Sequence, residues 1–138
     1  MRIRGATTDD LEWILRLASM HKHELGFVRR VSLENAIDRG TLLVIDGGHG
    51  FCEYYRRRDG WASVYAIVSV VPGGGRALMD AIARPIRLSC PEDLAANGFY
   101  AHIGGHNVAI VNGKKRRLRE WHWYANDTSV TLQQKMSL

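Results

Sequence analysis

The feature that most constrains this chain is a long apolar strand that leads into three glycines and then into a helix. It spans Ser63–Ala83 and reads Ser-Val-Tyr-Ala-Ile-Val-Ser-Val-Val-Pro-Gly-Gly-Gly-Arg-Ala-Leu-Met-Asp-Ala-Ile-Ala. A glycine-rich turn between a strand and a helix exposes backbone N–H groups at the positive end of the helix. The stretch therefore predicts a binding site for a phosphate or another anion.

Length and composition indicate a folded intracellular protein. The 138 residues are enough for one domain and too few for two, and the 46% hydrophobic and 24% charged residues are typical of a globular chain. No apolar run reaches the roughly 18 residues of a membrane span, so we expect no membrane partner. The start, Met-Arg-Ile-Arg-Gly-Ala, has no apolar signal region, which predicts a cytoplasmic protein. Cys52 and Cys90 are isolated, so we expect buried thiols in a reducing compartment.

The charge balance favours anionic partners. Lys and Arg number 19 against 14 Asp and Glu, which gives a net charge of +5. Nucleic acid, coenzyme A and acidic metabolites are the partner classes that such a surface attracts. The excess is concentrated in Arg56–Arg58 and Lys114–Arg119. These clusters either grip phosphates or are solvated ends of hairpins, and the sequence leaves both readings open.

Patterning predicts a mixed α/β chain. Strands are expected at Arg2–Ala6, Thr41–Asp46, Phe51–Arg57, Trp61–Val71, Ile86–Ser89, His106–Asn112 and Leu118–Tyr124. Helices are expected from the capping segment Thr7–Asp10 to about Met20, from Ser32 to Gly40, at Gly75–Ala83 and at Ala95–Ile103, with a loop at His21–Phe27. The strand–helix–strand unit Trp61–Ser89 predicts parallel pairing of its strands. We expect one domain over residues 1–124 and a tail at 125–138, of which Asp127–Leu138 is frayed or contacts a partner as a strand.

Three stretches of the sequence resemble the GNAT superfamily of acyl-CoA-dependent N-acyltransferases. Ile3–Leu11 is similar to the opening strand and capped helix of that family, and Val68–Met79 to its fourth strand, pyrophosphate loop and third helix. Asp93–Gly104 carries an Asn-x-x-Tyr helix. The loop is shorter than in the family, because only Gly73 and Gly74 separate Pro72 from Gly75-Arg76. The resemblance implies a mostly antiparallel, twisted sheet of about seven strands, with about four helices on both faces.

The resemblance also implies an acyl-CoA site, with acetyl-CoA or another acyl-CoA as the donor. The residues that it assigns to the cofactor are Val68 and Val70 for the pantetheine arm, Gly73, Gly74, Gly75, Arg76 and Ala77 for the pyrophosphate, and Asn97 for positioning. Tyr100 would protonate the leaving thiolate, since a phenol can supply a proton to sulfur. Without the resemblance, the favoured interpretation of Tyr100 is a core tyrosine of an amphipathic helix.

Two carboxylates are candidate bases for the proton of the acceptor amine. Glu53 lies within a predicted strand, where a carboxylate that faces a cleft would have a raised pKa. Glu24 lies in the segment between the first two helices, which covers the acceptor in this family. Each has a simpler interpretation: Glu53 as an outward-facing strand residue, and Glu24 as an ordinary charged residue of a loop. His21, His23 and Glu24 lack the spacing of a zinc site, so we expect no metal.

The acceptor is an amine, and the surface charge suggests where it is carried. Tyr65, Lys114, Lys115 and Arg116 are the candidate acceptor-binding residues, by stacking and by pairing with phosphates. The same basic hairpin can instead hold the 3′-phosphate of coenzyme A. The first hypothesis is therefore an N-acyltransferase with an amine acceptor, and acceptors on nucleic acid (a modified base or an aminoacyl-tRNA) are among the candidates. The alternative is a degenerate GNAT fold that binds nucleic acid or protein without turnover, and by analogy a homodimer is possible.

Overall fold

The computed structural model describes residues 1–125, and strand pairing places its strands in one seven-stranded sheet. Its elements in chain order are β1 (Ile3–Gly5), the 3-10 turn η1 (Thr8–Asp10), α1 (Leu11–Met20), α2 (Lys22–Leu25), α3 (Arg30–Arg39), β2 (Leu42–Ile45), β3 (Gly50–Arg56), β4 (Ala62–Ser69), α4 (Gly74–Asp80), β5 (Ile86–Pro91), α5 (Ala96–His102), β6 (His106–Asn112) and β7 (Arg117–Trp123). The strand order is β1-β2-β3-β4-β5-β7-β6. The predicted mostly antiparallel α/β fold is confirmed. The tail predicted at Asp127–Leu138 lies outside the described residues.

The chain forms two compact units, each with its own packing. The first contains Met1–Arg56 and Val64–Ile82, and the second contains Arg57–Ser63 and the chain from Ala83 onward. The strand β4 passes from the second unit into the first after Ser63. In the first unit β4 pairs with β3 and is the edge strand, because β1, β2 and β3 precede it in the sheet order.

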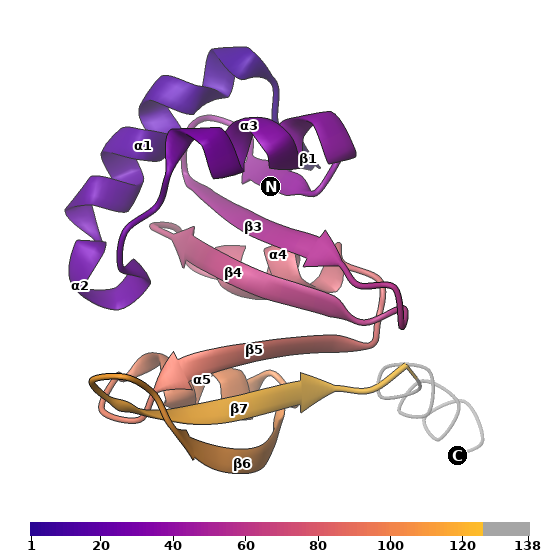
Figure 1. Ribbon diagram of the computed structural model, residues 1–138. Helices are drawn as coiled ribbons and strands as arrows, with labels where there is room; N and C mark the ends of the chain where they lie inside the picture. Colours follow the sequence, from indigo (N-terminus) through magenta and orange to yellow (C-terminus); the bar gives the residue numbers. More distant parts are fainter. Residues whose placement is uncertain (126–138) are drawn as a thin grey trace. The chain divides into compact units, whose positions relative to one another are not determined.

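In the first unit, helices cover both faces of the sheet (Figure 1). On one face, α1 and α3 bury Ile14 and Leu33 against Val44 of β2, Phe51 of β3 and Ala66 of β4. On the other face, α4 contacts β2 and β3. It buries Leu78 and Met79 completely. Alternate residues of each strand therefore face different helices, which is the period-two pattern of a sheet buried on both sides.

The start of α1 is held by a partly buried ion pair between Arg4 and Asp10. Arg4 donates two hydrogen bonds to Asp10, at 2.8 and 3.0 Å, and the N–H of Thr7 and the indole Nε1 of Trp13 donate to the same carboxylate. Asp10 is only 5% exposed. Its pKa is held well below its usual range, chiefly by the hydrogen bonds from Arg4. The predicted helix start at Thr7–Asp10 is confirmed, and it also links α1 to β1.

In the second unit, β5, β7 and β6 form a ladder that α5 covers (Figure 1). Antiparallel registers pair Ile86 with Trp123 and Leu88 with Trp121. The first residues of β4 pair in parallel with β5, through Ala62 with Ile86 and Ser63 with Arg87, so the predicted parallel strand–helix–strand unit is confirmed.

Several predicted boundaries were wrong by one to three residues. The loop predicted at His21–Phe27 contains a helical turn, α2, because Gly26 N–H and Leu25 N–H bond back to the carbonyls of Lys22 and His21. The helix predicted at Gly75–Ala83 is α4 (Gly74–Asp80), and the strand predicted at Ile86–Ser89 extends to Pro91 because β7 pairs with it to that residue. No helix in residues 1–125 is long and apolar enough to cross a membrane.

Candidate active site

The strand β4 presents one free backbone edge in the first unit. Val70 N–H donates to the carbonyl of His49 at 2.9 Å, so the N–H of Val70 points toward the β3 side. Backbone groups alternate in direction along a strand, and those of Val68 therefore also point toward β3. The groups directed away from β3 are those of Ile67 and Ser69, whose partners must come from outside the sheet of this unit. The sequence assigned Val68 and Val70 to the pantetheine arm. Because their backbone groups point toward β3, only their side chains are left to contact that arm.

The turn after β4 is built on Ser69 and Gly74. The hydroxyl of Ser69 accepts from Val71 N–H at 3.2 Å and donates to Val71 C=O at 3.0 Å. Gly73 has φ +77° and caps α4, and Gly74 N–H donates to Val71 C=O at 3.1 Å. A Cβ on Gly74 would lie 2.0 Å from Ser69 Oγ and 2.7 Å from Ile45 Cδ1. Only glycine lets α4 begin this close to the end of β4.

Three backbone donors of this turn have no partner in the described part of the chain. Gly74 N–H is bonded to Val71, and Ala77 N–H is bonded to Gly73 C=O at 3.0 Å. The N–H groups of Gly73, Gly75 and Arg76 donate to no acceptor within residues 1–125. The Arg76 side chain is exposed and has no ion pair within residues 1–125. Unsatisfied N–H groups beside a guanidinium suit an anion with several oxygen atoms.

Glu53 is a buried carboxylate beneath α3. It is 5% exposed, and the Ser32 hydroxyl of α3 donates a hydrogen bond to it. Burial raises the pKa of Glu53, and the hydrogen bond from Ser32 opposes that rise. The plainer sequence reading, an outward-facing strand residue, is wrong, because period two places Glu53 on the same face as Phe51.

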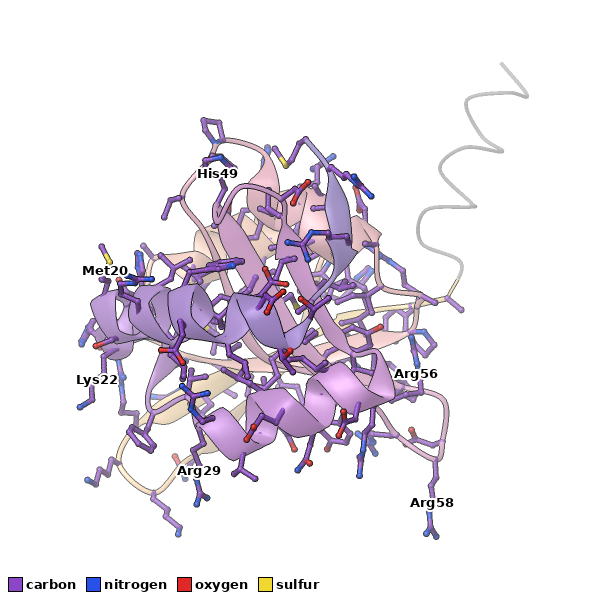
Figure 2. All side chains as sticks on the ribbon, turned by 90° about the horizontal axis from the view of Figure 1, so that it is seen from above. Met20, Lys22, Arg29, His49, Arg56 and Arg58 are labelled. Carbon is purple, nitrogen blue, oxygen red and sulfur yellow. The ribbon has the colours of Figure 1, made fainter. Side chains whose placement is uncertain are left out.

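Glu24 lies on α2, beside a pocket of the first unit. Its side chain is half exposed and approaches His21 Nδ1 at 3.9 Å. The pocket has a volume of about 470 Å³. Its lining residues come from α1, α2 and the start of α3, and they are Leu15, Ala18, Ser19, Lys22, Gly26, Phe27, Val28, Arg29, Arg30 and Val31. Figure 2 shows Met20, Lys22 and Arg29 projecting outward from this part of the surface.

In the second unit, Tyr100 belongs to an aromatic cluster. It is 7% exposed, and its ring lies 5.6 Å from Phe99, 6.2 Å from Trp121 and 5.9 Å from Trp123, measured between centroids. Gly105 closes the cluster, because a Cβ there would lie 2.7 Å from Trp123 Cζ2. The ring of Tyr100 is therefore part of the core, as the interpretation without the resemblance predicted. Its hydroxyl group remains the candidate acid.

Asn97 is committed to bonds within the second unit. Its Nδ2 donates to the carbonyls of Pro91, Glu92 and Leu94, at 2.9, 3.2 and 2.9 Å. Its Oδ1 accepts from Trp121 Nε1 at 2.9 Å. Asn97 thus fixes the connection between β5 and α5 to β7, and it acts on any ligand only by holding this part of the chain in place.

Three arginines of the basic hairpin are paired with two acidic residues. Arg116 pairs with Asp93 at 2.8 Å, and Arg117 and Arg119 approach Glu92 at 3.2 and 3.7 Å. Only Lys114 and Lys115 lack an ion-pair partner among the described residues of this hairpin. The predicted phosphate-binding surface is therefore smaller than the sequence indicates.

The other candidate residues are also placed. Tyr65 lies on β4, is 61% exposed and packs at a tilt against Tyr55, with ring centroids 4.7 Å apart. Cys52 and Cys90 are free, buried thiols, as predicted. Burial raises the pKa of Cys90 to about 11, which leaves it protonated and unreactive at neutral pH. Within residues 1–125, no three His, Cys, Asp or Glu side chains are grouped as metal ligands would be.

Comparison of the sequence with models of known protein families and with curated proteins finds no match. Solved structures match closely in fold. A GNAT-family acetyltransferase from Bacillus cereus has a TM-score of 0.75 at 17% identity, over 89% of this chain and 96% of its own. Ard1 from Thermoplasma volcanium has a TM-score of 0.74 at 19% identity, over 88% of this chain and 95% of its own. The ribosomal-protein-S18-alanine N-acetyltransferase from Escherichia coli has a TM-score of 0.62 at 16% identity, over 88% of this chain and 90% of its own. The chain therefore has the GNAT acetyltransferase fold.

Proposed function

We propose that this protein is an N-acetyltransferase that takes its acyl group from acetyl-CoA and transfers it to an amine of a protein. The support for the acetyl-CoA donor is the turn after β4, where the N–H groups of Gly73, Gly75 and Arg76 are unpartnered. They lie next to the free edge of β4. The support for a protein amine is the fold likeness to acetyltransferases whose names specify a ribosomal-protein alanine.

The residues of the turn fit a pyrophosphate. Three amides and the Arg76 guanidinium supply donors and one positive charge, and the outward groups of Ile67 and Ser69 suit the amides of a pantetheine arm. Acetyl-CoA supplies an activated thioester, whose sulfur leaves as a thiolate. In this proposal the chain binds and orients the donor through β4 and its turn, and Tyr100 supplies the proton to the thiolate.

The acceptor amine must lose a proton to attack. Glu53 and Glu24 remain the proposed bases, and the structure distinguishes them by environment. Burial has already raised the pKa of Glu53, which brings a carboxylate nearer to the pKa of an effective base at neutral pH. Glu24 is half exposed but lies next to the pocket that contains Lys22 of its own helix.

Thermal unfolding with and without acetyl-CoA tests the donor. A ligand at a hundred times its Kd adds about 2.7 kcal/mol to the free energy of unfolding. We expect a clear rise in Tm with the wild type, a smaller rise with Arg76→Glu, and an undiminished rise with Arg16→Glu, an equal charge change on α1. Absence of any rise at millimolar acetyl-CoA would remove the proposal.

Mass spectrometry of acetylated peptides tests the chemistry. Tyr100→Phe should lower turnover by about 10²-fold or more while acetyl-CoA still raises Tm, because only proton donation is lost. Glu53→Gln and Glu24→Gln should be compared by the pH dependence of turnover. The true base is the residue whose amide variant loses the acidic limb of the profile. Unchanged turnover in Tyr100→Phe would exclude the phenol as the acid.

The alternative is a binding protein for nucleic acid that lacks turnover. The ion pairs of Arg116, Arg117 and Arg119 with Asp93 and Glu92 weaken that alternative, since they leave two free lysines on the hairpin. Retention of the protein on RNA that is abolished by Lys114→Glu with Lys115→Glu, together with no response to acetyl-CoA, would favour it over the enzyme.

A further inference from the structure

We propose that the pocket between α1, α2 and the segment Gly26–Val31 binds an acidic peptide, with an apolar side chain in its floor and Asp or Glu carboxylates on Lys22 and Arg29. This proposal rests on the proposed function for one point only, that the peptide is the acceptor. The pocket has a volume of about 470 Å³, which lies within the range of roughly 300–1,000 Å³ that ligand pockets occupy.

The floor of the pocket is apolar. Leu15 and Ala18 are one helical turn apart on α1, so both face the pocket, and Val28 approaches from the connecting segment. All three also contact the buried core of the first unit. The floor is therefore fixed by core packing, and it can accept a small aliphatic side chain without rearrangement.

The rim of the pocket carries exposed apolar side chains. Phe27 is 79% exposed and Val31 is 55% exposed, and both line the pocket. Met20, at the end of α1 nearby in the chain, is 74% exposed. Large apolar side chains that gather at the mouth of a pocket indicate a contact surface for a partner. They extend that surface beyond the pocket, which suits a chain of several residues better than a small metabolite.

The charge of the lining is positive and partly unpaired. Its three cationic residues are Lys22, Arg29 and Arg30, and no Asp or Glu lines the pocket. Arg30 is paired with Glu12 of α1, so it is already neutralised. Lys22 and Arg29 have no ion-pair partner in residues 1–125. Two free cations at the edge of an apolar pocket complement carboxylates next to an apolar residue.

An arginine at position 29 does not stabilise α3. It occupies the N-cap of α3 and makes no side-chain cap hydrogen bond. The N-terminal end of a helix carries a partial positive charge, which disfavours a cation there, and Ser, Thr, Asp or Asn caps better. Arg29 is thus unfavourable for its own helix, and pairing with a bound anion gives it a role.

Peptide binding by the whole protein tests the inference. The probes are fluorescein-labelled peptides that begin Ala-Leu-Asp-Glu, Ala-Leu-Ser-Gln and Ala-Leu-Lys-Arg, measured by fluorescence anisotropy. We expect the acidic peptide to bind at least tenfold more tightly than the neutral one and the basic one to bind weakest. The preference should fall with added salt, because the cations are solvent-exposed.

Matched variants assign the binding to the pocket. Lys22→Glu and Arg29→Glu should each weaken the acidic peptide about tenfold, and Phe27→Ala should weaken acidic and neutral peptides alike. Arg39→Glu is the control, since Arg39 is exposed at the other end of α3 and does not line the pocket. Arg29→Asp is a second variant that removes the same cation and also improves the N-cap of α3. A loss of peptide binding in this variant therefore cannot be attributed to a destabilised helix.

Three outcomes would overturn the inference. They are equal affinity for the three peptides, equal losses in Arg29→Glu and Arg39→Glu, and displacement of the acidic peptide by an RNA oligonucleotide at equal charge concentration. Failure of the proposed function is separate, because it appears as no response of Tm to acetyl-CoA. If acetyl-CoA binds and acidic peptides bind but are not acetylated, the pocket holds a peptide that is not the acceptor, and the assignment as acceptor site is wrong.

Discussion

Replacing Gly74 by alanine should disrupt the turn after β4 more than any other single methyl group. The new Cβ would lie 2.0 Å from Ser69 Oγ, 2.9 Å from Ser69 Cβ and 2.7 Å from Ile45 Cδ1. The Ile45 methyl can turn away, but Ser69 is held by its hydrogen bonds to Val71. Overpacking of this kind costs about 1–3 kcal/mol, and we expect the upper end, about 3 kcal/mol, for Gly74→Ala.

A double-mutant cycle with Ser69 isolates the clash. Ser69→Ala alone loses the turn hydrogen bonds and should cost about 1 kcal/mol. In the double variant the closest contact, to Oγ, is absent, so the total cost should fall below the sum of the two single costs. We expect a favourable coupling free energy of about 1–2 kcal/mol.

Urea unfolding monitored by tryptophan fluorescence measures these costs, and Tm with acetyl-CoA measures the site. Gly98→Ala is the control, because Gly98 lies within α5 and a Cβ there meets nothing within 4 Å. It should stabilise the protein by about 0.4–1 kcal/mol. Gly74→Ala should also abolish the acetyl-CoA response, since the donors of Gly73, Gly75 and Arg76 move with the start of α4. Strict additivity in the cycle, or a full acetyl-CoA response in Gly74→Ala, would refute this account of the turn.

Three further predictions concern stability. The pKa of Asp10 is lowered in the folded state, so its contribution is present above the unfolded pKa of about 4 and is lost as the pH falls through the folded pKa. Asp10→Asn should therefore cost about 2–3 kcal/mol at pH 7 and much less at pH 2, and an equal cost at both would contradict the linkage. Arg29→Asp should raise the free energy of unfolding by about 0.5–2 kcal/mol in urea titrations, and a loss would show that Arg29 does stabilise α3. Asn97→Ala should cost about 2–3 kcal/mol, because three carbonyls and the Trp121 indole lose their partner. Asn97→Asp should cost at least as much, since its carboxylate would face those carbonyls, and a stable Asp variant would contradict the assigned bonds.

Local signals in the sequence predicted most of the elements. The capping segment Thr7–Asp10, the β-branched strand at Thr41–Asp46 and the strand–glycine–helix stretch are each determined by neighbours in the chain, so their physics is readable from the sequence. The strand His106–Asn112 was predicted with the observed bounds. The helical turn α2 was missed, and a loop was predicted at His21–Phe27, because four residues give no helical period to detect.

The sequence by itself therefore determined the α/β class, the parallel strand–helix–strand unit, and the likeness to the GNAT fold that the solved structures bear out. Only the tertiary structure decided which groups are free to bind a ligand. It showed that Gly74 and Ala77 use their N–H groups internally while Gly73, Gly75 and Arg76 do not. It also showed that Asp93 and Glu92 pair with three arginines of the basic hairpin, and that Lys22 and Arg29 remain without an ion-pair partner in residues 1–125, beside an apolar pocket. The reason is physical: a residue's availability depends on partners that are distant in the chain, and composition counts charges and donors without showing which of them are already satisfied.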